Sequence, residues 1–374
     1  MKRILALDGG GIRGVFTLEV LLRIEELLRE HYRKLDPEKA EKFVLRDHFD
    51  CFAGTSTGAI IATLLCWGKT VQEILDMYVE FGKKMFQPVP WYRPITKYLM
   101  NRFEEGPLCE MLQGLFMENG AHATLGSPSL FKRDGETGDG KLLLVVVRNH
   151  TTGSAWPLTN NPKAIFNDRK RKDCNLDIPL WELVRASTAA PTYFQAAEIL
   201  LGKKKSLFVD GSITPYANPA VIAALTAVLP GYRVNWKPGP ENIRLISVGT
   251  IQFSSELPVK HPRLWVGYNA AKIPAALLQG AAWQQDYLCR CLGQCIFGDT
   301  LDREVGDLVG AQLPFLRAWF SYVRYNRTYK AAEMDKIVHE NPDVARIDAV
   351  EAIPYLGNIG KTYAKEHVKI EHLI

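Results

Sequence analysis

The sequence predicts an α/β fold with a central, mostly parallel sheet and helices on both of its faces. Short apolar runs alternate with amphipathic segments up to about residue 250, and this alternation is typical of the class. The chain has 374 residues, of which 47% are hydrophobic, so it can bury a large core. We find no internal repeat in it.

The N-terminal half supplies the first elements of this pattern. The apolar run at residues 3–7 stops at an aspartate and three glycines, as a buried strand would. Residues 15–35 carry leucines near helical spacing with charges between them, which predicts an amphipathic helix. Further elements are expected in the order strand, buried helix, helix, at 49–53, 59–67 and 71–85.

The rest of the chain continues the alternation after an interruption. From 87 to 140 prolines and glycines break the pattern around a short helix at 108–117, so a cap insertion is expected at about 87–140. The run at 141–150 holds six successive apolar residues, half of them β-branched, and predicts a buried strand. The remaining predicted elements are a helix at 180–185, a strand ending at Asp210, a helix at 219–228 and a strand at 242–250.

These elements suggest a two-part organisation. Residues 1–255 would form the catalytic domain with its cap, and residues 256–374 a mostly helical C-terminal region, packed on the domain or continuous with it. The first part contains every strand predicted above, and the second is aromatic-rich.

Composition excludes several classes of protein. Lys and Arg number 46 against 41 Asp and Glu, and a formal charge of +5 is too small for a dedicated nucleic-acid binder. Seven cysteines without a C-x-x-C pair argue against a disulfide framework, and against a zinc site at Cys289, Cys291 and Cys295. No secretory signal or membrane-spanning run is visible. We therefore expect a soluble cytoplasmic protein that contacts a membrane at its surface without spanning it.

The first of three glycine-bearing turns is DGGGIRG, residues 8–14. Gly9, Gly11 and Gly14 satisfy G-x-G-x-x-G, the pattern of a dinucleotide site. That site also needs an acidic residue at the end of a second strand about twenty residues on, where a helix is predicted instead. Successive glycines can instead point several N–H groups one way and bind an oxyanion. Arg13 would hold this loop or meet a phosphate.

The second turn is GTSTG, residues 54–58, and the third is FVDGS, residues 208–212. GTSTG matches the nucleophile elbow G-x-S-x-G between an apolar strand and an apolar helix, although Ser56 could also be a simple helix N-cap. FVDGS ends a predicted strand with Asp210, which a plain Asp-Gly turn would also explain.

A nucleophilic serine needs a base, and the residues leave two arrangements open. If Asp210 is the acid of a Ser-His-Asp triad, His261 is a candidate base by its position after the last predicted strand. Alternatively, Asp210 contacts Ser56 directly as a dyad. A carboxylate with an ordinary pKa is a weak base, so a dyad requires that burial raises the pKa of Asp210.

Taken together, the three turns resemble the patatin-like phospholipase family. The family pattern is D-G-G-G-x-[KR]-G, G-x-S-x-G and D-G-[GA] in this order, and Ser212 departs from it in the third motif. The segments ASTAAPTYF (186–194) and YVRYN (322–326) also resemble parts of the family. The resemblance spans about 4–250 and implies a three-layer α/β/α fold with a helical cap.

The resemblance also implies roles for individual residues. Ser56 would be the nucleophile and Asp210 the base, so no catalytic histidine, metal or cofactor is needed. The backbone N–H groups of the first loop would form the oxyanion hole, contributed by Gly9, Gly10 and Gly11. Residues in supporting positions would be Arg13, Gly54, Gly58 and Gly211.

The implied substrates are acyl esters of phospholipids in a membrane. An apolar mouth would come from Trp91, Tyr92 and Tyr98, unless these aromatics pack the cap on the core. The basic clusters at 169–172 and 203–205 would touch anionic headgroups, unless they are solvated loops. Some bacterial members of the family are antiviral effectors that a cyclic nucleotide activates and assembles, which suggests a cyclic nucleotide and a homo-oligomer as partners here.

Two other classes of function remain at this point. A nicotinamide-dependent oxidoreductase would use the glycines of the first turn as a cofactor site. A catalytically silent lipid- or nucleotide-binding protein would keep the fold without the reaction, although the presence of both Ser56 and Asp210 argues against it.

Overall fold

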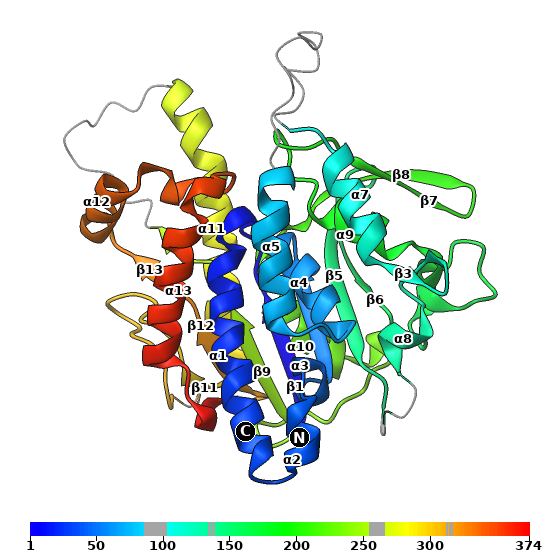
Figure 1. Ribbon diagram of the computed structural model, residues 1–374, viewed down its shortest axis with the longest axis horizontal. Helices are drawn as coiled ribbons and strands as arrows, with labels where there is room; N and C mark the ends of the chain where they lie inside the picture. The colour runs from blue at the N-terminus through cyan, green and yellow to red at the C-terminus, as the bar shows by residue number, and fades with distance from the viewer. Residues whose placement is uncertain (86–102, 134–135, 137–138, 254–265, 312, 314–316) are drawn as a thin grey trace.

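The computed structural model describes residues 1–85, 103–133, 136, 139–253, 266–311, 313 and 317–374. Within them, a nine-stranded sheet runs through the molecule in the order β11-β12-β9-β1-β2-β5-β8-β7, with β6 paired to β5 (Figure 1). Its strands are β1 (Lys2–Leu7), β2 (Cys51–Thr55), β5 (Leu142–Asn149), β6 (Ser154–Thr159), β7 (Ala197–Leu201), β8 (Lys204–Asp210), β9 (Ile243–Val248), β11 (Gln294–Phe297) and β12 (Ser321–Tyr325). Two small sheets pair β3 (Met117–Glu118) with β4 (Ala121–His122), and β10 (Gln252–Phe253) with β13 (Thr328–Tyr329).

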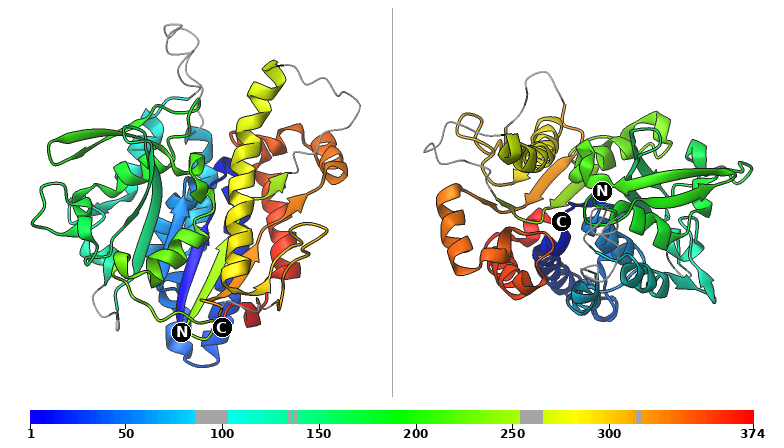
Figure 2. Two further views of the ribbon diagram at one scale, coloured as in Figure 1. Left: turned by 180° about the vertical axis from the view of Figure 1, so that it is seen from behind. Right: turned by 90° about the horizontal axis from the view of Figure 1, so that it is seen from above.

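Helices cover both faces of the central sheet, as the two views of Figure 2 show, and this confirms the predicted α/β class. The helices of the described residues are α1 (Gly14–Arg33), α2 (Pro37–Glu41), α3 (Leu45–His48), α4 (Thr57–Cys66), α5 (Val71–Met85), α7 (Gly106–Leu115), α8 (Pro128–Phe131), α9 (Leu180–Ser187), α10 (Ala220–Val228), α11 (Val266–Leu292), α12 (Ala331–Glu340) and α13 (Ile353–His367). Among them, no helix is both long and apolar enough to cross a bilayer.

Each face of the sheet has its own apolar core. In β1, Leu5 and Leu7 pack with α1, α4, α5, α9 and α13, whereas Ile4 and Ala6 pack with α10 and α11. Parallel strands that are buried on both faces are expected to be continuously apolar rather than alternating. Burial on both faces explains the uninterrupted apolar runs of the sequence.

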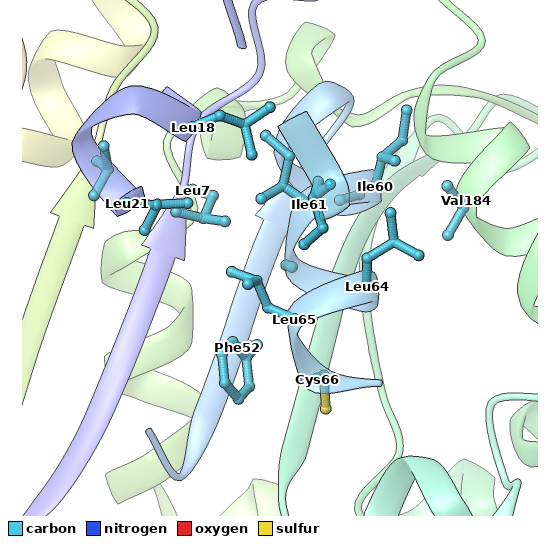
Figure 3. Packing of buried hydrophobic residues seen from close by; sticks show 14 of the residues in the cluster. Leu7, Leu18, Leu21, Phe52, Ile60, Ile61, Leu64, Leu65, Cys66 and Val184 are labelled. Atoms are coloured by element: carbon cyan, nitrogen blue, oxygen red, sulfur yellow. The ribbon is translucent and has the colours of Figure 1, made fainter. Parts of the chain in front are cut away.

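Helix α4 lies at the centre of the larger core. All ten of its residues are buried, and Figure 3 shows it between Leu18 and Leu21 of α1 on one side and Val184 of α9 on the other. A helix that is apolar all round has no solvent face and is held from every side. The start of α4, where Ser56 lies, is therefore fixed by packing.

The sheet is mostly parallel, as predicted, but its part around β5 is antiparallel. Strand β8, which ends at Asp210, runs antiparallel to β5, and so does β6. Strands β6 and β7 were not predicted. Because β6 occupies one edge of β5, β2 and β8 share the other edge and approach each other end to end, with Thr55 opposite Val146 and Asp210 opposite Val147.

The C-terminal region contributes strands as well as helices. Strands β11 and β12 extend the sheet beyond β9, and α13 packs against α1. Neither strand was predicted, because both are short and because Arg324 interrupts the apolar run of β12. The boundary at residue 255 and the cap limits at 87–140 stay predictions. The described part of the cap range contains α7, β3, β4 and α8.

A buried ion pair ties β12 to the end of β1. Arg324 Nη1 and Nη2 donate to the two carboxylate oxygens of Asp8 over 2.9 and 2.5 Å, and Nη1 also donates to Ser247 Oγ over 2.7 Å. Both partners are almost fully buried. Such a pair is costly to break because the remaining charge has no water to solvate it.

We therefore expect Arg324→Met to lower the free energy of unfolding by about 3–5 kcal/mol, since it leaves the Asp8 carboxylate buried without its partner. Denaturation in urea measures this loss. Arg317→Met is the control, because Arg317 forms an exposed pair with Glu241 and its loss is expected to cost less than about 1 kcal/mol. Equal effects of the two substitutions would contradict the role of the buried pair.

Candidate active site

Ser56 lies in a strained turn between β2 and α4. Its backbone has φ 54° and ψ −125°, a conformation that residues with a side chain rarely adopt. Gly54 and Gly58 permit the turn: a Cβ on Gly54 would lie 2.2 Å from the Gly58 carbonyl oxygen, and a Cβ on Gly58 would lie 2.2 Å from that of Leu7. The two glycines let α4 approach β1 and β2 closely, as expected for a nucleophile elbow.

The structure brings Ser56 and Asp210 into direct contact. Ser56 Oγ donates a hydrogen bond to Asp210 Oδ2 over 2.6 Å, and both side chains are buried, with 8% and 2% of their surface exposed. The Ser212 N–H donates to the other carboxylate oxygen over 2.7 Å. A Cβ on Gly211 would lie 2.3 Å from the Val146 carbonyl oxygen, so this turn also requires glycine.

Asp210 reaches Ser56 from a strand that runs antiparallel to its neighbour β5. Open α/β sheets place their sites at the carboxyl ends of parallel strands, which share one edge of the sheet. The prediction that the two residues share a site agrees with this geometry, but β8 enters from the opposite direction, beyond the end of β2. The roles of Ser56 and Asp210 stay predictions, and the antiparallel direction of β8 is a feature that the sequence did not indicate.

Burial also changes the acidity of Asp210. Loss of solvent raises the pKa of its carboxyl to about 6, although hydrogen bonds from Ser56 and Ser212 oppose the change. A carboxylate with this pKa is a stronger base than an exposed one and is still mostly ionised at neutral pH. Ser212, the departure from the family pattern, thus acts on Asp210 through its backbone and its hydroxyl.

The DGGGIRG loop passes directly beside Ser56. A Cβ on Gly9 would lie 3.2 Å from Ser56 Cβ. The Gly9 N–H donates to the Ala217 carbonyl over 3.0 Å and is therefore already occupied. Among the described residues, the N–H groups of Gly10 and Gly11 donate to no acceptor. These two groups are the ones that are free to bind an oxyanion, and Gly11 has a φ of 58° that favours glycine.

Arg13 stabilises this loop from within the protein. Its Nε donates to the Gly10 carbonyl over 3.4 Å, and burial lowers the pKa of its guanidinium to about 10. The interaction supports the first of the two functions expected for Arg13, which is to hold the loop.

Several residues that the sequence analysis gave no role hold the site in place. Ser187 Oγ accepts the Ser56 N–H over 3.0 Å and donates to the Val146 carbonyl over 2.7 Å. Thr250 Oγ1 donates to the Gly9 carbonyl over 3.0 Å, and Tyr78 donates its hydroxyl to the Gly11 carbonyl. Only Ser187 had a sequence signal, its place in the ASTAAPTYF segment. Thr250 and Tyr78 lie in no recognisable motif, and only the fold brings them to the site.

Two alternatives remained open from the sequence: a dinucleotide site at the first turn and a Ser-His-Asp triad. The second strand, β2, ends at Thr55 and not at the acidic residue that a dinucleotide site needs. His261, with Trp91, Tyr92 and Tyr98, lies outside the described residues. Among the described histidines, none is hydrogen-bonded to Ser56 or Asp210.

Comparisons with known proteins give a match to one family model and to several relatives. The family model described as "Patatin-like phospholipase" matches residues 5–224. The chain is 28% identical over 272 residues to a "cGAMP-activated phospholipase" of Escherichia coli, covering 71% of this chain and 67% of that protein. It is 28% identical over 260 residues to a protein of the same name from Vibrio cholerae, covering 67% and 64% of the two chains.

A third relative is the "85/88 kDa calcium-independent phospholipase A2" of Mus musculus, 27% identical over 232 residues. That match covers 60% of this chain and 23% of the mouse protein, so the chain spans less than a quarter of that relative. Because the family model matches more than half of the sequence, the chain belongs to the patatin-like phospholipase family.

Proposed function

We propose that the protein is a serine acyl hydrolase that cleaves fatty-acyl esters of phospholipids. The observation that carries the proposal is the buried hydrogen bond of 2.6 Å between Ser56 Oγ and Asp210 Oδ2, beside a loop with two N–H groups that donate to no acceptor among the described residues. Nucleophile, base and oxyanion donors are the three parts that acyl transfer needs. Membership of the family supports the class of substrate.

In the proposed first step, Ser56 Oγ attacks the ester carbonyl carbon while its proton moves to Asp210. The N–H groups of Gly10 and Gly11 stabilise the negative charge that develops on the carbonyl oxygen. The intermediate then collapses, and the leaving alcohol oxygen takes the proton from Asp210. The products are the lysolipid and an acyl ester on Ser56.

In the second step, water attacks this acyl ester and gives its proton to Asp210. The same two N–H groups stabilise the second oxyanion. When the bond to Ser56 breaks, its Oγ takes the proton back, and the fatty acid leaves. Asp210 thus alternates between base and acid, which its raised pKa favours, because proton transfer is most efficient when the pKa lies near the working pH.

Substitution of the proposed dyad tests this function. We expect Ser56→Ala to lower kcat/KM for a phospholipid by at least about a thousandfold, and Asp210→Asn by about 10²–10⁴-fold, because nucleophile and base act in every turnover. Release of fatty acid from mixed phospholipid vesicles measures both. His261→Ala is the discriminating variant: full activity agrees with the dyad, and loss of activity would establish a triad instead.

The raised pKa of Asp210 predicts a pH dependence. Because the base must be ionised, kcat/KM on a soluble short-chain ester is expected to fall about tenfold per pH unit below pH 6 and to level off above pH 7. Stopped-assay rates between pH 4.5 and 8.5, with folding checked at each pH, measure the profile. A rate independent of pH down to about 4 would mean that Asp210 keeps the pKa of an exposed carboxyl.

We also propose that a cyclic nucleotide activates the protein. The two bacterial relatives are named cGAMP-activated phospholipases, and the C-terminal region of this chain touches the DGGGIRG loop at two points. Arg324 binds Asp8, and the Ile347 carbonyl accepts the Ile12 N–H over 2.8 Å. A shift of this region would therefore move Gly10 and Gly11. Homo-oligomer assembly and an antiviral, membrane-degrading role stay predictions.

If a cyclic nucleotide activates the protein, the rate of phospholipid hydrolysis is expected to differ between the free and the nucleotide-bound protein. Vesicle hydrolysis is expected to rise about 5–150-fold on addition of cGAMP, the usual range of coupling between two sites. A linear dinucleotide with the same bases serves as the ligand control, and Ser56→Ala with cGAMP as the background. Full hydrolysis in the absence of any nucleotide would count against this regulation while leaving the hydrolase function intact.

A further inference from the structure

Two basic segments that are distant in the sequence lie side by side on the surface. One is the loop at 163–173, and the other is the β7–β8 hairpin at 197–207. They meet at the hairpin turn, where a Cβ on Gly202 would lie 2.7 Å from the backbone oxygen of Lys172. The two segments carry eight basic and three acidic residues, an excess as large as the net charge of the whole chain. We call their combined surface the hairpin face.

Five of the eight cations on the hairpin face have no acidic partner among the residues that the structure describes. Arg171 pairs with Asp173 over 2.9 Å and Lys205 with Glu198 over 2.6 Å, and Arg169 pairs with Asp177. Within the part of the chain that the structure describes, no acidic side chain pairs with the following exposed lysines: Lys163, Lys170, Lys172, Lys203 and Lys204. These ammonium groups remain available to an external anion.

The same face exposes large apolar side chains. Ile165 and Phe166 are 50% and 55% exposed, and Leu200 and Leu207 are 59% and 44% exposed. In the hairpin, Leu200 lies opposite Lys205, whereas the neighbouring Ile199 is buried on the other side. The solvent side of the hairpin therefore presents Leu200 and Leu207 beside the paired Lys205 and Glu198, and the unpaired Lys203 and Lys204 lie at and next to its turn.

This combination fits the surface of an anionic bilayer. Lysines are attracted to charged headgroups, and exposed leucine, isoleucine and phenylalanine gain free energy by entering the boundary of the acyl chains. A nucleic acid would use the cations but would offer little to the four aliphatic and aromatic side chains. A second copy of the chain would bring like charges together.

The hairpin face is also connected directly to the active site. Strand β8 begins at Lys204 on this face and ends at Asp210. Six residue steps along a strand span about 20 Å, so contact with a bilayer here would bring its surface to within about that distance of the dyad. Figure 1 shows the hairpin projecting from the sheet at the end where α7 and α9 lie.

We propose that the hairpin face docks the protein on membranes that contain anionic phospholipid. The proposal rests on the phospholipid substrate of the proposed function, but it makes a separate statement about where the membrane is bound. Docking would come from the unpaired lysines together with Leu200 and Leu207, and it would not require an active Ser56.

Binding is measured on the full chain carrying Ser56→Ala, so that the vesicles stay intact, by co-flotation with phosphatidylcholine vesicles with or without phosphatidylglycerol. Binding is expected only with phosphatidylglycerol and is expected to weaken with salt. Lys203→Glu with Lys204→Glu should weaken it at least about twentyfold, since each lysine near an anionic surface contributes about a fivefold factor. The matched control is Lys34→Glu with Lys42→Glu, two exposed lysines beside α2, expected to change binding less than about threefold.

The contribution of the exposed leucines to binding is tested with a second pair of substitutions. Leu200→Ser with Leu207→Ser should weaken binding by about tenfold or more, because the inserted leucines lose their transfer free energy. Leu35→Ser is the control, since Leu35 is 68% exposed and lies near α2. The proposal would be overturned if the test and control substitutions had equal effects, or if the protein bound equally to both kinds of vesicle. Tighter binding of a double-stranded oligonucleotide through the same lysines would overturn it as well.

Hydrolysis of a soluble short-chain ester separates this proposal from the proposed function. With Ser56 present, the two lysine substitutions should leave that rate unchanged and lower only the release of fatty acid from vesicles. If the wild-type protein fails to cleave either substrate but still floats with anionic vesicles through these lysines, the hydrolase function fails and the docking proposal stands.

Discussion

The backbones of β1, β2 and α4 meet so closely that no side chain fits between them. A Cβ on Gly54 or Gly58 would lie about 2.2 Å from a carbonyl oxygen of the neighbouring segment, far inside any tolerable contact. This approach forces Ser56 into its strained conformation at the start of α4 and brings the glycine loop after β1 to within reach of it. The packing of α4 on all sides holds the strain in place.

The chemistry of Asp210 depends on where β8 ends. Because β2 and β8 use the same edge of β5 from opposite directions, their last residues converge in the interior of the protein. The carboxylate is therefore removed from water, which raises its pKa, while Ser56 and Ser212 satisfy both of its oxygens. An exposed aspartate in a parallel neighbouring strand would have neither property.

The C-terminal region is in direct contact with the candidate site. Arg324 neutralises Asp8, the first residue of the DGGGIRG loop, and Ser247 of β9 shares its guanidinium. The Ile347 carbonyl holds the other end of the loop. The orientation of the N–H groups of Gly10 and Gly11 thus depends on segments that are more than 300 residues away in the sequence.

The sequence by itself determined the fold class and the central residues of the site. Apolar runs buried on both sides are visible without a structure, and so are glycines at turns that admit no side chain; this is why Ser56, Asp210 and the loop at 9–11 were recognisable. The tertiary structure alone decided the direction of β8, the membership of β11 and β12 in the sheet, and the supporting contacts of Ser187, Thr250 and Arg324. The reason is physical. Local patterns record what each segment must bury, whereas strand direction and long-range pairing depend on which edges and charges of other segments remain to be satisfied.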